Sequence, residues 1–213
     1  CETGALVSVS GDYTGSTTCA ASSFTFNITK STDAVYNFAI KQTDVAGNAS
    51  GTANFSWHRD TVVPAMVTVT APVDNPFASG DTNLTISGAC EASATVSLSG
   101  AGTDSVSCTA LGSYSFSVSK LVDGTYNYNI SQTDLAGNTS AALAFQWIRD
   151  TSVPSTPTVV TPAALPYQSN TNTISISVTC DSTLTPAKAV VNLAGDVLAA
   201  EVTSPAGVLS QNC

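Results

Sequence analysis

Charged residues are scarce in this chain. Lysine and arginine together number 6 and aspartate and glutamate 15, so 10% of the 213 residues are charged and the formal net charge is −9. The shortage of basic residues argues against nucleic acid or an anionic membrane surface as a partner, because both are bound through basic patches. Apolar runs of membrane-spanning length are also missing. The sequence therefore predicts no membrane span in this segment.

The side chains of common catalytic sites are lacking as well. His58 is the only histidine, and the repeat described below aligns it with Ile148, so it is not a repeated catalytic group. No phosphate-binding loop and no isolated pair of acidic residues is present. Catalytic triads and metal-assisted hydrolysis need such groups at close range. The composition therefore predicts that the protein is not an enzyme.

What the chain has is an internal repeat. The stretch "QTDVAGNAS" at 42–50 returns as "QTDLAGNTS" at 132–140, an offset of 90 residues. Upstream the offset is 89, so one residue is inserted in the second copy just after the position of Cys19. Further matches at 90 pair Asp33, Tyr36, Trp57, Arg59, Asp60, Thr61 and Pro64 with Asp123, Tyr126, Trp147, Arg149, Asp150, Thr151 and Pro154. A period near 90 residues is the size of one immunoglobulin-like (Ig-like) sandwich.

This period predicts three repeats, at 1–60, 61–150 and 151–213. The middle repeat is complete, the first lacks its first strands, and the third lacks its last strands. Half a sandwich leaves strand edges unpaired. We expect the chain to be a window on a longer repetitive polypeptide. The alternative is that repeat three of another molecule completes repeat one and so builds a filament.

Alternating apolar residues predict strands in the middle repeat. Stretches with this period-2 pattern are 83–90, 95–100, 113–120, 125–132 and 144–150, with an initial strand near 67–69. Clusters of Gly, Asp, Asn and Pro separate them, and no stretch has a convincing helical period. About seven strands of antiparallel type predict an all-β chain of tandem Ig-like sandwiches. Asp123-Gly124 forms a tight turn, and Tyr126 then stands where a tyrosine corner is expected.

Six cysteines fall into three ordered pairs. Repeat symmetry predicts one disulfide per repeat, and hence an oxidising, extracellular or cell-surface location. A zinc site is the competing interpretation, but the chain has no Cys-x-x-Cys and only one histidine. The predicted disulfides are Cys1–Cys19, Cys90–Cys108 and Cys180–Cys213.

Together, the run at 123–140 and "RDTSVPSTP" at 149–157 resemble the bacterial Ig-like repeats of very long surface adhesins. The shared features are an Asp-Gly-x-Tyr turn, a Thr-Asp-x-Ala-Gly-Asn loop and a linker of Asp-Thr-x-x-Pro type. Two features depart from that pattern, namely Val153 before Pro154 and the paired cysteines. The resemblance implies tandem Ig-like domains in a surface fibre, and calcium bound between domains.

The motif at 132–140 has two interpretations. As a hairpin turn, Gly137 supplies a positive φ while Asp134 and Asn138 bond the turn backbone. As a calcium site, Asp60, Glu91 and Asp134 converge at one pole of the sandwich, with Asn138 as a further ligand. Hard oxygen donors of this kind suit Ca²⁺. At the next junction Asp150 and Asp181 repeat the first two positions.

Two functions follow from these features. The first is a structural stalk, disulfide-stapled and calcium-stiffened, whose partners are neighbouring repeats or filament subunits. The second is a module that binds a surface ligand such as a glycan or a host protein. Repeat three is then the binding unit, since its two cysteines enclose 32 residues (181–212) against 17 (91–107) in the middle repeat.

Overall fold

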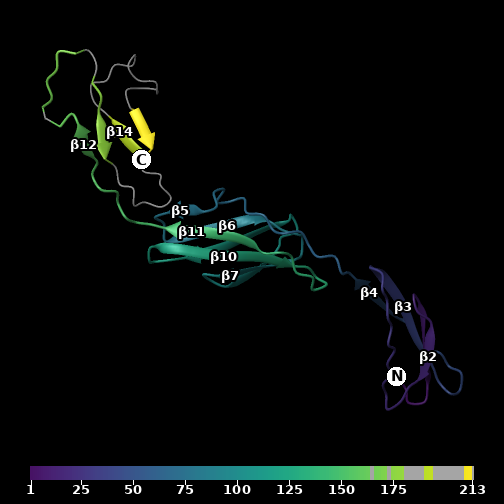
Figure 1. The fold of residues 1–213 in the computed structure, drawn as a ribbon. Helices are drawn as coiled ribbons and strands as arrows, with labels where there is room; N and C mark the ends of the chain where they lie inside the picture. The colour runs from purple at the N-terminus through teal and green to yellow at the C-terminus, as the bar shows by residue number, and fades with distance from the viewer. Residues whose placement is uncertain (164–165, 172–173, 180–189, 194–208, 213) are drawn as a thin grey trace. The chain divides into compact units, whose positions relative to one another are not determined.

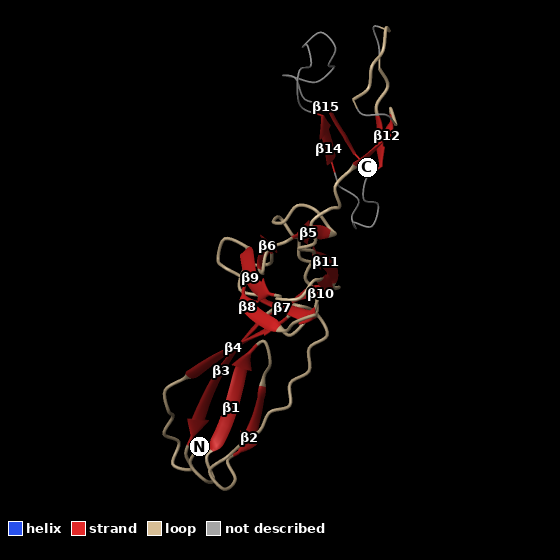
Figure 2. Cartoon of the chain, turned by 90° about the vertical axis from the view of Figure 1, so that its left-hand side faces the viewer, coloured by secondary structure: helices blue, strands red, loops and turns tan. Residues whose placement is uncertain are grey.

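The computed structural model contains strands, turns and loops, and no helix, in the residues that it describes (Figures 1 and 2). These are residues 1–163, 166–171, 174–179, 190–193 and 209–212. Within them, no helix is long and apolar enough to cross a membrane. Contacts divide the chain into two compact units, one of Cys1–Phe77, Asn83–Ser119 and Thr125–Trp147, the other of Ala78–Thr82, Lys120–Gly124 and the chain from Ile148 onward. The three predicted repeat boundaries stay a prediction.

Repeat one forms a single antiparallel sheet. Its strands are β1 (Leu6–Gly11), β2 (Gly15–Thr18), β3 (Ala34–Thr43) and β4 (Ala53–Arg59), in the order β2-β1-β3-β4. Alternate residues of β1 are buried, among them Val7 and Val9, and Phe38 of β3 is buried too. This alternation is the pattern of a sheet with one covered face.

Repeat two forms two sheets. The larger has the order β5-β11-β10-β7-β8, and the smaller pairs β6 with β9. Their bounds are β5 (Phe77–Ser79), β6 (Asn83–Ala89), β7 (Thr95–Gly100), β8 (Asp104–Ser107), β9 (Ser113–Ser119), β10 (Gly124–Thr133) and β11 (Leu143–Arg149). The side chains between the sheets form one core, as in an Ig-like sandwich.

Strand positions repeat with the sequence. β3 and β4 recur 90 residues later as β10 and β11, while β1 and β2 recur 89 residues later as β7 and β8. The register recurs as well, since Val9 lies opposite Ile40 in repeat one and Leu98 lies opposite Ile130 in repeat two. The repeat read from the sequence is therefore a structural repeat.

The predicted core of repeat two is confirmed. Tyr114 and Phe116 are buried on β9, Tyr128 and Ile130 on β10, and Trp147 on β11. Each large apolar side chain removed from water contributes about 1.5–3 kcal/mol to folding. Arg149, predicted on the same face of its strand as Trp147, is also buried.

Three details differ from the sequence prediction. β8 was not predicted, because Asp104–Ser107 holds only one apolar residue, Val106. The segment near 67–69 is not a strand, although the Thr68 amide donates to the Ala89 carbonyl at 3.1 Å and so attaches it to β6. Residues 24–29 of repeat one, which align with 114–119 of β9, also form no strand. β9 pairs only with β6, and the sequence holds no copy of β6 for repeat one.

Beyond repeat two the described residues form two short strand pairs. β12 (Thr158–Thr161) pairs with β13 (Ser177–Thr179), and β14 (Val190–Leu193) pairs with β15 (Leu209–Asn212). Both pairs are antiparallel.

Candidate functional site

The motif at 132–140, here named the receiving loop, is a turn built by its own side chains. The Asp134 carboxylate accepts hydrogen bonds from the backbone amides of Ala136 and Asn138 at 2.8 and 2.9 Å, and from the Asn138 side chain at 2.9 Å. Gly137 has a φ of +96°, which favours glycine. These contacts are those of the predicted hairpin turn. The copy at 42–50 makes the same three bonds through Asp44.

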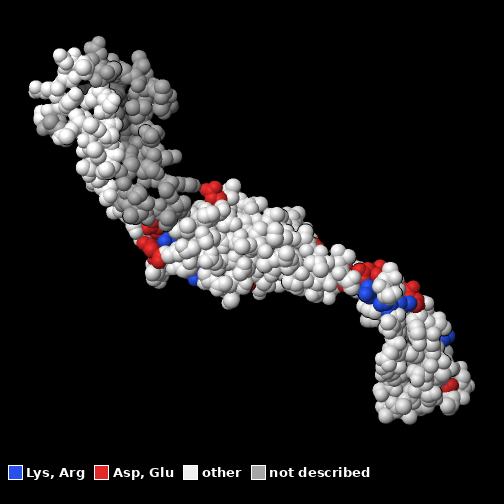
Figure 3. Space-filling view, in the orientation of Figure 1, with Lys and Arg blue, Asp and Glu red and all other residues white. Residues whose placement is uncertain are grey.

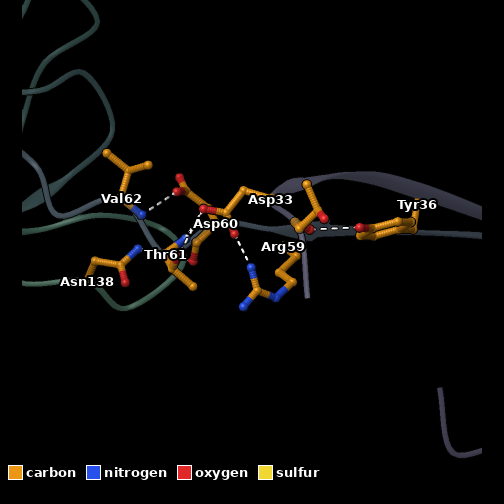
Figure 4. A network of polar contacts seen from close by, with 8 residues as sticks. Asp33, Tyr36, Arg59, Asp60, Thr61, Val62 and Asn138 are labelled. Carbon is orange, nitrogen blue, oxygen red and sulfur yellow. Dashed lines mark hydrogen bonds and ion pairs between the residues drawn. The ribbon is translucent and has the colours of Figure 1, made fainter. Parts of the chain in front are cut away.

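The receiving loop also holds the linker, residues 60–66, that leads from repeat one into repeat two. The Asn138 side-chain amide donates to the carbonyl oxygen of Asp60 at 3.2 Å (Figure 4). The Gln132 side-chain amide donates to the carbonyl oxygen of Ala65 at 2.7 Å. Pro64 and Val67 on either side of Ala65 are buried. The side-chain amides of Gln132 and Asn138 thus bind backbone oxygens of the preceding chain.

Repeat one has the same loop at 42–50. The incoming segment, here the name for residues 64–71 that lead into repeat two, has no counterpart for repeat one in this sequence. Gln132 is 2% exposed, whereas its copy Gln42 is only half-buried. Ser140 is buried, whereas its copy Ser50 is exposed. An open hollow lined by Gln42, Val7, Phe24, Ile40 and neighbouring residues lies beside the loop of repeat one. In repeat two the bond from Gln132 to Ala65 shows that the incoming segment lies against the receiving loop.

The chain leaving repeat one is held by a second group of contacts, here named the exit cluster. The Asp33 carboxylate forms an ion pair with Arg59 of β4 and accepts hydrogen bonds from the Thr61 amide at 3.1 Å and the Thr61 hydroxyl at 2.7 Å. Asp60, between them, caps the chain by accepting from the Val62 amide at 2.8 Å. Figure 4 shows these side chains together at the end of the sheet, with Tyr36 beside them donating its hydroxyl proton to the Thr32 carbonyl.

The exit cluster recurs at the end of repeat two. Asp123 forms an ion pair with Arg149 and accepts from the Thr151 amide and hydroxyl at 3.0 and 2.7 Å. Asp150 accepts from the Ser152 amide at 2.8 Å. Arg149 is fixed further by donating from Nε to the Asp81 carbonyl at 3.1 Å. Four contacts, the ion pair, the two threonine bonds and the cap, thus recur at one offset, which indicates that each of the two described repeats sets the path of the chain that leaves it.

Hydrogen bonds lower the pKa of the carboxylates in these sites. For Asp33 the main cause is the Thr61 hydroxyl, and for Asp123 it is the Thr151 amide, with the nearby arginine adding to both. For Asp134 and Asp44 the main cause of the lowered pKa is the side-chain amide of Asn138 and of Asn48. Donors that favour the charged form lower a carboxyl pKa. All four groups are therefore ionised acceptors at neutral pH.

The linker has little unattached length. Thr61 is held by the exit cluster, and Ala65 is held by Gln132. Between them, the Val62 amide is bonded to Asp60 and Pro64 is buried, while the side chains of Val62 and Val63 are exposed. Figure 3 shows acidic and basic side chains gathered over the end of β4 and further charged side chains at the β5 end of repeat two, whereas the middle of the visible surface of repeat two is almost free of charge. The ionic contacts of the described chain thus lie where repeats end.

The predicted calcium ligands serve other roles in this structure. Among the described residues, no three Asp, Glu, His or Cys side chains gather into a group suited to a metal ion. Asp60 and Asp150 cap the linkers, and Asp134 accepts three N–H donors. Glu91 meets the receiving loop through its backbone amide, which donates to Gln132. Asp181 lies outside the described residues. Calcium binding at these residues stays a prediction.

Two of the predicted cysteine pairs are joined. Cys1 bonds to Cys19 and Cys90 bonds to Cys108, with Cα atoms 5.9 and 6.0 Å apart. Cys90 follows β6 and Cys108 follows β8, so the second disulfide links the two sheets of the sandwich. Cys180 and Cys213 lie outside the described residues.

Sequence reasoning missed Gln132 and the exit cluster as functional groups. A signal was present, since Gln42, Asp33, Arg59 and Thr61 all recur at the 90-residue offset. Their partners are backbone atoms or residues about 26 positions away. Neither kind of partner is visible as a local motif.

Comparison with known proteins agrees with the fold. Residues 70–151 match the family model described as bacterial Ig-like domain. Among solved structures, the chain resembles the BSP domain of a biofilm-associated protein, at 16% identity and a TM-score of 0.31 over 70% of this chain and 25% of that one. It also resembles the D00-D0 domain of intimin, at 18% identity and a TM-score of 0.26 over 52% of this chain and 64% of that one.

This chain thus spans a quarter of the first of these proteins and under two thirds of the second. No curated protein matches the sequence. The resemblance to bacterial Ig-like repeats that the sequence predicted is confirmed for residues 70–151, and the all-β Ig-like class is confirmed with it.

Proposed function

We propose that this chain is a stalk segment of an adhesin-type protein at the bacterial cell surface or outside the cell. Its work is mechanical: it links Ig-like repeats in series and limits the bending of each joint. The observation that carries the proposal is the linker at 60–66, which is bonded to repeat one through Thr61 and to repeat two through Asp60 and Ala65.

Other features support the same function. The exit cluster recurs after repeat two, so the arrangement belongs to the repeat and not to one junction. Disulfides in both described repeats suit an oxidising environment. The family match at residues 70–151 is to a bacterial Ig-like domain, a class of domain that serves as a repeated unit in surface proteins of the kind proposed here.

The test compares two asparagines in the same turn. Asn138→Ala removes a bond within the turn and the bond to the Asp60 carbonyl. Asn48→Ala removes the matching bond to Asp44 and no bond to a linker. NMR relaxation of the full chain reports whether repeats one and two tumble together, and scattering reports the maximum dimension. We expect Asn138→Ala to increase independent tumbling and Asn48→Ala to leave it unchanged. Fully independent tumbling in the wild-type chain would contradict the stalk proposal.

A further inference from the structure

Gln132 is a buried side chain with both ends of its amide bonded. Its oxygen accepts from the Glu91 backbone amide at 2.7 Å, and its nitrogen donates to the Ala65 carbonyl at 2.7 Å. The backbone of Gln132 is fixed by Ser140. The backbone N–H of Gln132 donates to the Ser140 hydroxyl at 3.1 Å, and the backbone N–H of Ser140 donates to the backbone carbonyl of Gln132 at 2.9 Å. A side-chain amide carries both donors and an acceptor, so it can bridge two backbone groups. Gln132 bridges Glu91 to the incoming chain.

The Glu91 amide is in turn held by the disulfide. Glu91 directly follows Cys90, which is bonded to Cys108. The Cys90 amide donates to the Gly112 carbonyl at 3.0 Å, and the Cys108 amide donates to the Ala94 carbonyl at 2.8 Å. The Ala94 amide donates back to the Glu91 carbonyl at 3.1 Å. The short loop that presents the Glu91 amide is therefore closed at both ends by the disulfide and its neighbouring bonds.

Repeat one contains the same arrangement. The Glu2 amide, next to the Cys1–Cys19 disulfide, donates to the Gln42 side-chain oxygen at 2.9 Å. The Ala5 amide donates to the Glu2 carbonyl at 3.0 Å, as Ala94 does to Glu91. Among the described residues, none accepts a hydrogen bond from the Gln42 side-chain nitrogen. The bond from the Cys-Glu pair to the glutamine thus recurs in both described repeats, which identifies it as part of the repeated structure.

We propose that the Cys90–Cys108 disulfide positions the incoming segment of its repeat through the Glu91 amide and Gln132. The segment, residues 64–71, is then docked by a relay that begins at the disulfide. Gln132 is the positioning residue, and the glutamate at 91 contributes its backbone, not its carboxylate. The inference rests on the proposed stalk function and adds that the disulfide acts on the joint as well as on the sandwich.

The first experiment changes one end of the amide. Gln132→Glu keeps an oxygen for the Glu91 amide and places a second oxygen against the Ala65 carbonyl. The readout is hydrogen exchange of the Thr68 and Thr70 amides, which donate to Ala89 and Ser87 when the segment is docked. At pH 7.5 we expect protection of these amides to fall about tenfold, the equivalent of one lost buried hydrogen bond.

At pH 5 we expect the variant to regain protection relative to wild type. A buried carboxyl has a raised pKa, and once protonated it donates to the Ala65 carbonyl as the amide does. The carboxylates of Asp33, Asp44, Asp123 and Asp134 stay ionised there because their pKa values are lowered. Gln132→Met should lose protection at both pH values, and Gln42→Glu should not affect these amides. Equal loss at both pH values for Gln132→Glu would overturn the role given to Gln132.

The second experiment tests the disulfide end. One double variant, Cys90→Ser/Cys108→Ser, removes the disulfide of repeat two, and the control, Cys1→Ser/Cys19→Ser, removes that of repeat one. Each double variant is measured with and without Gln132→Met. We expect only the Cys90→Ser/Cys108→Ser variant to reduce the hydrogen-exchange protection of the Thr68 and Thr70 amides, by about tenfold. When Gln132 is already replaced, the same change should reduce protection little further, because the effects of residues in one network are non-additive. If the serine variants fail to fold, brief reduction and alkylation of the folded wild-type and Gln132→Met proteins shows whether loss of the disulfides exposes Thr68 and Thr70 only when Gln132 is present.

The outcomes separate the two proposals. Additive effects, or equal effects of the two disulfides on Thr68, would overturn the relay. If the relay fails while Asn138→Ala still frees the repeats to tumble, the stalk function stands. If no variant changes tumbling because wild-type repeats already move independently, the stalk function fails.

Discussion

Asp123 binds Thr151 twice, through the threonine amide at 3.0 Å and through its hydroxyl at 2.7 Å. The same pair of bonds joins Asp33 to Thr61 at 3.1 and 2.7 Å. A carboxylate that accepts both groups of one residue fixes the backbone of that residue, not only its side chain. Each repeat therefore sets the direction in which the chain leaves it.

Replacing the two threonines by valine should raise the pKa of their partner carboxyl groups unequally. Thr61→Val removes the main cause of the lowered pKa of Asp33. Thr151→Val leaves the main cause at Asp123, the backbone amide, in place. We expect the larger rise at Asp33, measured by NMR titration of the carboxyl carbons. A larger rise at Asp123 would contradict the assigned order of the bonds.

Acid should weaken the junctions below about pH 4. The pKa values of Asp33, Asp123, Asp44 and Asp134 are lowered in the folded chain. Such groups stabilise the fold fully above the unfolded pKa, about 3.9, and lose that contribution as pH falls through the lower folded value. Melting temperatures should therefore be flat from neutral pH to about 5 and then fall. A decline centred near pH 6 would point to other groups.

Gly88→Ala should displace the incoming segment. A Cβ atom at Gly88 would lie 1.7 Å from the Thr68 carbonyl oxygen, so the segment must move away from β6. We expect a loss of about 1–3 kcal/mol or more in the free energy of unfolding. Gly102→Ala is the control, since its Cβ would meet nothing nearer than 3.8 Å. Chemical denaturation of both variants gives the comparison, and a tolerated Gly88→Ala would argue against close packing of the segment.

The two matched tryptophans should differ in their contribution to stability. Trp147 is fully buried, while Trp57 at the same place in repeat one is half-buried. Trp147→Ala should reduce the free energy of unfolding of repeat two by about 3–5 kcal/mol. Trp57→Ala should cost repeat one clearly less. Equal losses would mean that repeat one is covered in solution by a partner.

Calcium removal should leave the fold of the receiving loop intact. Asp134 accepts hydrogen bonds from three N–H donors, and Asp60 accepts one from the Val62 amide, so the turn and the cap are formed by the chain itself. If the site predicted at Asp60, Glu91 and Asp134 binds calcium, the melting temperature of the described repeats should be higher with calcium than with chelator, and Asp134→Ala should abolish the difference. An equal melting temperature in both conditions would contradict the predicted site.

Much of the fold was predictable because it is encoded by side-chain type. The alternation in β9 and β10 predicted which residues are buried, and Gly137 with Asp134 predicted the turn. β8 was missed because Val106 is its only apolar residue. The binding unit suggested for repeat three concerns residues mostly outside the described part of the chain, and it stays a prediction.

The site was less predictable because its partners are backbone groups. Asn138 and Gln132 bind the carbonyl oxygens of Asp60 and Ala65, and every residue has such an oxygen. The sequence therefore shows the donor and gives no sign of the acceptor. Asp60, Asp134 and Asp150, which are predicted calcium ligands, accept hydrogen bonds from N–H groups in this structure. The sequence alone does not distinguish a carboxylate that binds a metal ion from one that accepts such hydrogen bonds.

Recognition of the linker through its carbonyl oxygens also bears on how such arrays evolve. Because the receiving loop binds main-chain oxygen atoms, a repeat does not require particular side chains in the linker that comes before it. A gene segment of one period can be duplicated or deleted by unequal recombination, and the new neighbours meet through the same bonds. Selection on length can then act by adding or removing whole units, without remaking a single joint.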